Sequence, residues 1–223
     1  SESEINISLS PQFVSRGGEK LSMAFKKFPI NVKERVCMDV GISTGGFTDC
    51  LLQNGAKLIY GIDVGYGQTS WKIRNNSKVI LHERKNIRYL TPSIIFSNDN
   101  EFPDFVVADL SFISLKYVLK PIRNLLKKNF FEGVFLIKPQ FEVGKDIVGK
   151  GGVVKEKKHH IFALQSVISS IISNDWYING LIASPLVGPA GNHEYLIWIS
   201  DRKLVNNLIN QDFLKSLVEN TLN

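Results

Sequence analysis

The sequence predicts an α/β fold with a mostly parallel sheet, an antiparallel strand at its edge and helices on both faces. Three observations predict it: short apolar runs alternate with helical patterns, a glycine-rich turn follows the first strand, and a turn-rich link joins the last two apolar runs. Strands that alternate with helices form βαβ units, whose right-handed crossovers place helices on both sides of a parallel sheet.

Most of the chain reads as strands with helices between them. Phe13–Phe28 has apolar residues at helical spacing, which predicts an amphipathic helix ahead of the first strand. The short apolar runs predict strands at Arg35–Val40, Lys57–Val64, Lys78–His82, Phe105–Ala108 after Pro103, and Gly133–Lys138 before Pro139. The segments between and after them predict helices at Gly45–Asn54, which Gly55 closes, and at Thr69–Arg74, Ser114–Lys128 and Lys155–Ser173.

Two further apolar runs near the end of the chain predict the antiparallel part of the sheet. Trp176–Ala183 and Glu194–Ser200 are strand-like, and the link Ser184–Asn192 contains two prolines and two glycines. Such a link between consecutive strands is typical of an antiparallel pair.

The 223 residues suffice for one domain with a full core. We expect this domain at residues 13–223, after a flexible lead-in or truncated linker at 1–12. The chain shows no signal-peptide pattern and no apolar run near the ~20 residues that span a membrane. Cys37 and Cys50 lie in apolar patterns, so we expect two buried thiols in a reducing, cytoplasmic compartment.

The stretch Asp39-Val-Gly-Ile-Ser-Thr-Gly-Gly-Phe47 joins the first strand to the first helix after it. Gly41 allows a ligand to approach the backbone, and ligands of open α/β sheets bind beside such turns. Ser43 stands where dinucleotide-binding turns have a second glycine, which weakens a pyrophosphate interpretation. Asp63 ends the next strand 24 residues after Asp39, near the ~20-residue offset of an acid that binds ribose hydroxyls. The pattern favours a nucleoside-type cofactor.

Two more polar residues follow buried strands. Asp109 comes directly after Phe105–Ala108, and Lys138 ends the apolar run at Gly133–Lys138. Either residue has an ordinary structural interpretation: Asp109 as a helix cap, and Lys138 as a rim lysine whose charge reaches water. Their position at carboxyl strand ends is also typical of catalytic groups.

The chain is basic, with a formal net charge of +6 and a pI of about 9.2. Excess positive charge favours a polyanionic partner. The glycine- and lysine-rich segment Val143–Lys158 is suited to contact one. The lysines and Arg123 of the predicted helix Ser114–Lys128 indicate a solvated face. His159 and His160 are expected to be surface or capping residues, and we expect no metal site.

At several motifs the chain resembles the TlyA haemolysin/rRNA methyltransferase family, whose catalytic domain is FtsJ-like (RrmJ-like). The matching segments are residues 15–21 (SRGGEKL), 39–49 (DVGISTGGFTD), 109–112 (DLSF), 138–141 (KPQF), 149–153 (GKGGV) and 188–194 (GPAGNHE). They are spread over nearly the whole chain and occur in the family's order.

The resemblance implies a Rossmann-like class I methyltransferase that transfers a methyl group from S-adenosylmethionine to a ribose 2′-hydroxyl of RNA, with ribosomal RNA as the expected substrate. It implies a catalytic tetrad of Lys20, Asp109, Lys138 and Glu194, in which we hypothesise that Lys138 is the base or steering donor. The implied cofactor-binding residues are Asp39, Gly41, Ser43, Thr44, Gly45, Gly46, Phe47, Asp63, Asn86 and Asp109. We expect Arg16, Lys145, Lys150 and Lys155 to contact RNA phosphates.

The family also carries an S4-type RNA-binding domain, which this sequence does not include. Three alternatives stay open at this point: an NAD-dependent oxidoreductase, a haemolysin-like membrane-active protein, and a cofactor-bound ribosome-assembly factor. A basic amphipathic stretch such as Phe13–Phe28 could lie on a membrane surface, although core packing explains its apolar face better.

Overall fold

The computed structural model describes residues 11–96, 101–149, 151–206 and 208–223. Most of the predicted lead-in therefore lies outside the described residues. The strands are β1 (Val36–Val40), β2 (Leu58–Ile62), β3 (Val79–His82), β4 (Phe105–Ala108), β5 (Glu132–Ile137), β6 (Tyr177–Ala183) and β7 (Tyr195–Ser200). The helices are α1 (Gly17–Lys27), α2 (Gly46–Gln53), α3 (Trp71–Arg74), α4 (Pro92–Ile95), α5 (Leu119–Asn124), α6 (Lys157–Ile172) and α7 (Gln211–Leu222). Short 3-10 turns form η1 (Ile87–Tyr89), η2 (Leu115–Tyr117) and η3 (Pro139–Phe141).

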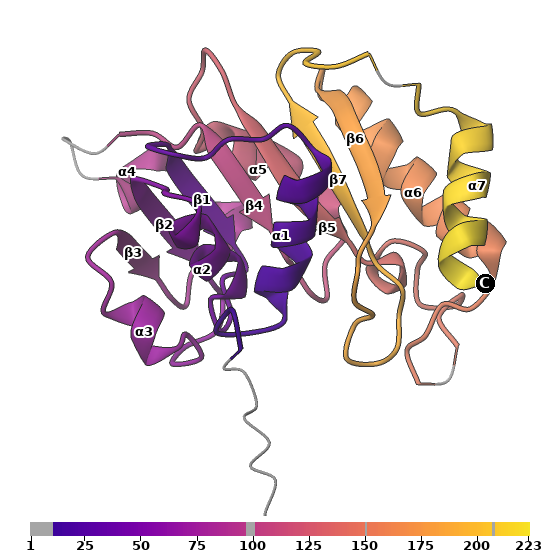
Figure 1. The fold of residues 1–223 in the computed structure, drawn as a ribbon, viewed down its shortest axis with the longest axis horizontal. Helices are drawn as coiled ribbons and strands as arrows, with labels where there is room; N and C mark the ends of the chain where they lie inside the picture. Colours follow the sequence, from indigo (N-terminus) through magenta and orange to yellow (C-terminus); the bar gives the residue numbers. More distant parts are fainter. Residues whose placement is uncertain (1–10, 97–100, 150, 207) are drawn as a thin grey trace, which may run out of the picture.

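The described strands form one sheet in the order β3-β2-β1-β4-β5-β7-β6 (Figure 1). Strands β1 to β5 are parallel, whereas β7 is antiparallel to both β5 and β6. This confirms the predicted α/β class and the antiparallel pair. The carboxyl ends of β1 to β5 and the start of β7 therefore meet at one edge of the sheet, where open α/β folds bind ligands.

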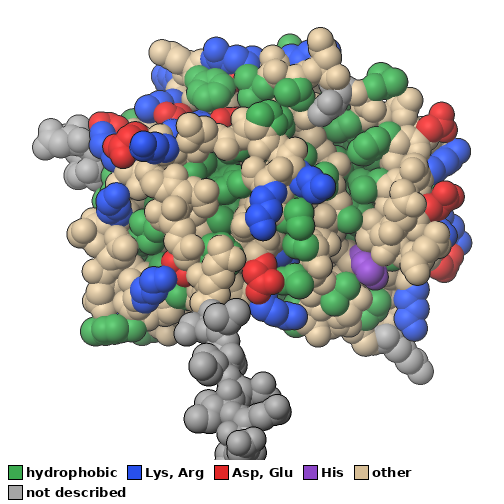
Figure 2. All heavy atoms as spheres, viewed as in Figure 1, with side chains coloured by type: hydrophobic (Ala, Val, Ile, Leu, Met, Phe, Trp, Pro, Cys, Tyr) green, Lys and Arg blue, Asp and Glu red, His purple; other side chains and the backbone are tan. Residues whose placement is uncertain are grey.

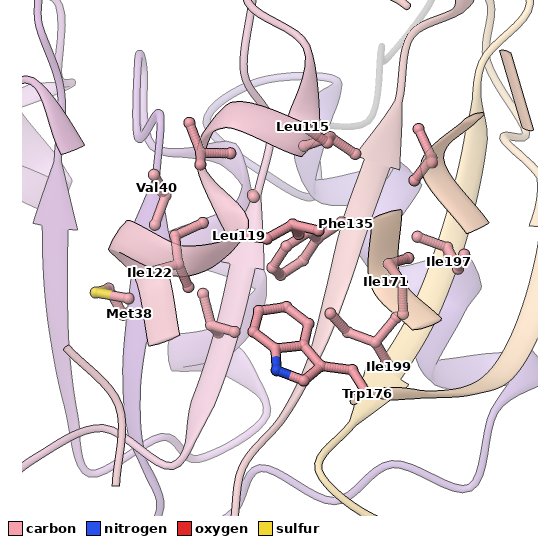
Figure 3. Packing of buried hydrophobic residues seen from close by; sticks show 14 of the residues in the cluster. Met38, Val40, Leu115, Leu119, Ile122, Phe135, Ile171, Trp176, Ile197 and Ile199 are labelled. Carbon is pink, nitrogen blue, oxygen red and sulfur yellow. The ribbon is translucent and has the colours of Figure 1, made fainter. Parts of the chain in front are cut away.

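Two apolar layers cover the two faces of the sheet. Helices α1 and α2 bury Leu21, Phe47 and Leu51 against one face. Helices α5, α6 and α7 cover the other, and Figure 3 shows Leu119 of α5 and Ile171 of α6 packed near Phe135. Because both faces are covered, most residues of the parallel strands are apolar, as expected for a parallel sheet, and Asp39 of β1 is a buried exception.

The predicted helix Ser114–Lys128 is wrong in extent. The chain forms the turn η2 and then the short helix α5, which begins at Leu119. Pro121 explains the break, because a proline lacks the N–H that a helix interior needs but fits the first turn of a helix. The first predicted helix is also shorter than expected, since α1 begins at Gly17 rather than at Phe13.

The last helix, α7, was not predicted. A signal for it exists in the sequence: Asn210 accepts a hydrogen bond from the N–H of Phe213 as an N-cap, and Leu214 and Val218 are buried one turn apart.

Cys37 and Cys50 are buried free thiols, as expected. Among the described residues, no helix has the length and apolar character needed to cross a membrane.

Candidate functional site

Two lysine–carboxylate pairs lie at the carboxyl edge of the sheet. Lys20 Nζ is 2.5 Å from Glu194 Oε2, and Lys138 Nζ is 2.6 Å from Asp109 Oδ1. Lys138 also donates a hydrogen bond of 3.0 Å to Ser111 Oγ. All four paired side chains line one cavity of about 220 Å³. The structure thus brings together the four residues that the resemblance named, although Lys20 and Glu194 are 174 positions apart.

Strand register places three of these side chains. Asp109 directly follows β4, and Lys138 directly follows β5. Ile137 pairs with Tyr195 between β5 and β7, so the next residues outward, Lys138 and Glu194, lie side by side. Neighbouring strands therefore place the side chains of Lys138, Asp109 and Glu194 at the same edge of the sheet.

Lys20 reaches the cavity because α1 packs on the start of α2. Asp49 of α2 accepts a hydrogen bond of 2.9 Å from the N–H of Val14. A Cβ at Gly46 would clash with Ser15 Oγ and would lie 2.8 Å from the backbone N of Gly18. The absence of a side chain at Gly46 thus allows residues 15–18 to pack closely against the start of α2.

A second cavity of about 300 Å³ adjoins the first. Gly41, Ser43 and Asp109 line both cavities. Asp63 lines the second one, together with apolar side chains that include Ile62. A pocket with apolar walls and a few polar groups is typical of small-molecule sites. The arrangement suits a ligand that extends from the second cavity to the first.

The glycine turn after β1 is held by its neighbours. Gly41 has a φ of 86°, and a Cβ there would lie 2.6 Å from the carbonyl oxygen of Asp109. Ser43 also lies in the left-handed region, with a φ of 49°, and its N–H donates to Asp63 Oδ2 at 2.7 Å. The N–H of Gly65 donates to the other Asp63 oxygen at 2.7 Å. Asp63 therefore joins the turns that follow β1 and β2.

Asp39 is fully buried beneath this turn. Its Oδ2 accepts a hydrogen bond of 2.7 Å from Thr48, whereas its Oδ1 has no partner among the described residues. Burial raises the pKa of Asp39 to about 7, and the nearby carboxylates of Asp109 and Asp63 also act to raise it. Such a buried, underpartnered oxygen is rare in proteins and is often a sign of a functional site.

The other predicted cofactor residues are divided between the cavities. Thr44, Gly46 and Phe47 line the cavity of the two ion pairs, whereas Gly45 and Asp39 line neither. Asn86 lines a third cavity, of about 590 Å³, and accepts a hydrogen bond from the N–H of Arg88.

The third cavity has an aromatic and basic rim. Phe112 is 91% exposed, has a φ of 64°, and its ring centroid lies 5.2 Å from that of Phe141. Arg88, Lys116 and Lys145 line the same cavity. An exposed ring on a strained backbone is a common feature of binding sites. Phe112 was not predicted, although the motif DLSF ends on it.

Three of the four residues predicted to bind RNA are exposed. Arg16 lines the cavity of the ion pairs, Lys145 lines the third cavity, and Lys155 precedes α6. Lys150 lies outside the described residues.

His160 is neither a surface nor a capping residue, so that prediction is wrong. It is fully buried, with ring nitrogens 3.0 Å from the Tyr195 hydroxyl and 2.9 Å from the Val154 carbonyl oxygen. Burial lowers the pKa of His160. Its spacing from Leu164 and Val167, on the buried side of α6, was the signal that could have placed it.

Comparison with known proteins identifies relatives along nearly the whole chain. Residues 13–200 match the family model described as FtsJ-like methyltransferase. YqxC of Bacillus subtilis, named as an rRNA methyltransferase, is 45% identical over 186 residues, which are 83% of this chain and 65% of that protein. TlyA of Mycobacterium tuberculosis, named as a 16S/23S rRNA (cytidine-2′-O)-methyltransferase, is 45% identical over 195 residues, which are 86% of this chain and 71% of that protein. This chain thus spans slightly less than two thirds of YqxC.

Solved structures of similar fold include a protein named as a hemolysin and a fibrillarin. A Lactococcus lactis protein described as a hemolysin has a TM-score of 0.86 and 38% identity, covering 94% of this chain and 98% of its own. Aeropyrum pernix fibrillarin, described with natively bound S-adenosyl-L-methionine, has a TM-score of 0.57 and 16% identity, covering 82% of this chain and 76% of its own, which shows a shared fold alone. The chain therefore belongs to the FtsJ-like methyltransferase family and has its Rossmann-like fold.

Proposed function

We propose that this protein transfers the methyl group of S-adenosylmethionine to a ribose 2′-hydroxyl of ribosomal RNA. The observation that carries the proposal is the meeting of the pairs Lys20–Glu194 and Lys138–Asp109 on one cavity beside the glycine turn. Family membership supports methyl transfer over the nicotinamide-dependent alternative, and the name of the TlyA relative supports an RNA ribose as the acceptor.

The residues present fit S-adenosylmethionine. Each Asp63 oxygen accepts one backbone N–H and keeps lone pairs that can accept from ribose hydroxyls. Ile62 and Leu110 give the same cavity an apolar wall suited to an adenine ring. The turn Gly41–Phe47 runs past both cavities and would hold the methionine part. The cofactor supplies an electrophilic methyl group when bound.

We assign the proton of the attacking hydroxyl to the pair Lys138–Asp109. Lys138 Nζ is held between Asp109 Oδ1 and Ser111 Oγ before any substrate binds. The Lys138 ammonium would steer the hydroxyl oxygen toward the methyl carbon of the bound cofactor. As the new O–C bond formed, the bond between that carbon and the sulfur would break, and the Asp109 carboxylate would take the hydroxyl proton. Alignment of this kind can lower a barrier by about 7–11 kcal/mol.

The pair Lys20–Glu194 lines the same cavity. The side chains of Lys20 and Glu194 are only 9% and 1% exposed, so their charges act with little screening. The Lys20 ammonium would stabilise negative charge that develops on the attacking oxygen, and Glu194 holds the ammonium in place.

The rim of the third cavity supports a nucleic-acid acceptor. Phe112 offers an exposed ring beside Arg88, Lys116 and Lys145. Aromatic rings interleaved with basic side chains bind unpaired nucleotides, and one stacked base contributes about 1–3 kcal/mol. We infer that the nucleotide to be methylated, or its neighbour, stacks on Phe112.

Methyl transfer by the variant Lys138→Ala tests the proposal. We expect labelled methyl to pass from S-adenosylmethionine to ribosomal subunits with the wild-type protein, and the modified ribose can then be mapped. Lys138→Ala should lower turnover by at least about 100-fold, because general acid–base groups contribute roughly 10²–10⁴-fold. Thermal stabilisation by the cofactor should be retained, since the substituted side chain is assigned to the acceptor.

The matched control is Lys203→Ala, which removes an exposed lysine beyond the far end of β7 and should leave turnover unchanged. A fully active Lys138→Ala variant would remove this residue from the mechanism. Stabilisation by NAD and not by S-adenosylmethionine would contradict the proposed cofactor.

A further inference from the structure

The side chain of Asn192 joins the turn before β7 to a segment about 40 residues earlier in the chain. It is 1% exposed. Its Oδ1 accepts a hydrogen bond of 2.9 Å from the N–H of Val154, and its Nδ2 donates one of 2.7 Å to the carbonyl oxygen of Gly152. One amide therefore satisfies a donor and an acceptor of the same distant backbone.

The segment that Asn192 holds has little structure of its own. Between η3 and α6 the described residues form no helix or strand, and Gly151 and Gly152 both have positive φ. The carbonyl of Val154 accepts from His160 Nε2 at 2.9 Å. Because a carbonyl can only accept, Nε2 carries the proton and Nδ1 accepts from the Tyr195 hydroxyl. The backbone of Val154 is thus fastened on both sides by side chains from elsewhere in the fold.

The same turn also contacts the carboxylate of Glu194. The N–H of Gly188 donates a hydrogen bond of 2.8 Å to the carbonyl oxygen of Asn192. A Cβ at Gly188 would lie only 2.6 Å from Glu194 Oε1, so the carboxylate rests directly on this glycine. A shift of Asn192 would therefore move the surface against which Glu194 packs.

We propose that Asn192 is a positioning residue that couples the segment 143–155 to the Glu194 carboxylate. The inference rests on the proposed function and adds to it a structural link between the RNA-contacting segment and the pair Lys20–Glu194. The segment carries Lys145 and Lys155, two of the residues expected to contact RNA. When RNA engages this segment, the Asn192 amide transmits its position to the pair Lys20–Glu194, although Asn192 itself touches neither RNA nor cofactor.

The test compares Asn192→Ala with a matched control, Asn179→Ala. Asn179 is also fully buried, donates to Ser200 Oγ at 2.7 Å and accepts from the N–H of Leu204 at 2.8 Å. Ser200 pairs with Glu132 at the start of β5, which places Asn179 at the opposite edge of the sheet from Glu194. Among the described residues, each amide donates to one group named above and accepts from another. Both variants therefore remove a buried, hydrogen-bonded amide, and only Asn192→Ala should affect the site.

Two readouts are measured at a temperature where both variants are folded. In Asn192→Ala, trypsin should cleave after Lys145 and Lys155 at least about 10-fold faster, since loss of the latch favours local opening. Its turnover on ribosomal subunits should fall by about 10-fold or more, because a catalytic group misplaced by about 1 Å can lower the rate by about 100-fold. Thermal stabilisation by S-adenosylmethionine should be unchanged. In Asn179→Ala, the cleavage rate and turnover should equal those of the wild type.

Unchanged cleavage and turnover in Asn192→Ala would overturn the inference. Equal changes in cleavage rate and turnover in Asn192→Ala and Asn179→Ala would also overturn it, because they would reflect reduced stability alone. If the wild type transfers no methyl to RNA, the proposed function fails, and the cleavage rates still decide whether Asn192 holds the segment.

Discussion

At the scale of single residues, Asp39 shows how a buried carboxyl can be both a cost to the fold and a feature of the site. Only one of its two oxygens is hydrogen-bonded within the described residues. Burial raises its pKa from 3.8 to about 7, so a carboxylate here is disfavoured in the folded state near neutral pH.

The variant Asp39→Asn is expected to change how stability depends on pH. Between pH 3.8 and about pH 7, the folded state keeps a proton on Asp39 that the unfolded state has released. The free energy of unfolding therefore falls as pH rises through this window. Asp39→Asn removes this fall and keeps an acceptor for Thr48. Urea unfolding without cofactor, at about pH 5 and about pH 8, should show a smaller decrease of stability in the variant than in the wild type. Identical pH dependence would contradict the assignment.

At the scale of elements, the contact between α1 and α2 brings Lys20 to the sheet edge. Gly46 is the first residue of α2, and its missing side chain makes room for Ser15 and Gly18. The glycine cluster of the turn therefore serves packing between helices as well as any ligand. This dual use explains why a pattern of glycines does not by itself name the bound molecule.

Gly46→Ala should loosen this contact. The added Cβ would lie too close to Ser15 Oγ, just before α1, and to the backbone N of Gly18 within α1. Overpacking of this kind costs about 1–3 kcal/mol. We expect a lower urea midpoint and a large decrease in turnover, since Lys20 moves with the segment. Gly17→Ala, whose Cβ would make only ordinary contacts of 3.5 Å or more, is the control. Equal stability of the two variants would show that the lead-in yields without cost.

At the scale of the whole molecule, net charge alone does not locate the proposed RNA-binding site. Lys and Arg side chains are spread over the face shown in Figure 2 rather than gathered into one cluster. The basic residues that line the cavities at the sheet edge, such as Arg16, Arg88 and Lys145, are a better guide, because they lie beside the proposed chemistry.

Salt dependence of RNA binding should separate these residues from the general surface charge. The double variant Lys145→Ala/Lys155→Ala should bind ribosomal RNA more weakly. The slope of log affinity against log salt should become shallower by about 0.7–0.9 for each phosphate that the variant no longer neutralises. Lys203→Ala removes a lysine at the opposite edge of the sheet and should leave the slope unchanged. Equal slopes for all three proteins would place the RNA elsewhere.

Local patterns in the sequence determined the α/β class, the strands of the sheet to within a few residues, and the acids at the ends of β1, β2 and β4. They succeeded because apolar runs and strand-end residues report on neighbours in the chain. They failed at Ser114–Lys128, where Pro121 limits the helix although the periodicity continues, and at His160, which packing places in the core.

The tertiary structure alone decided which of these residues meet. Lys20 and Glu194 meet because α1 packs on α2 and because β7 runs antiparallel to β5. The sequence around either residue does not predict these arrangements. The same holds for the amide of Asn192, whose partners lie about 40 residues away. Contacts across such separations depend on strand order and on close packing, which only the folded chain sets.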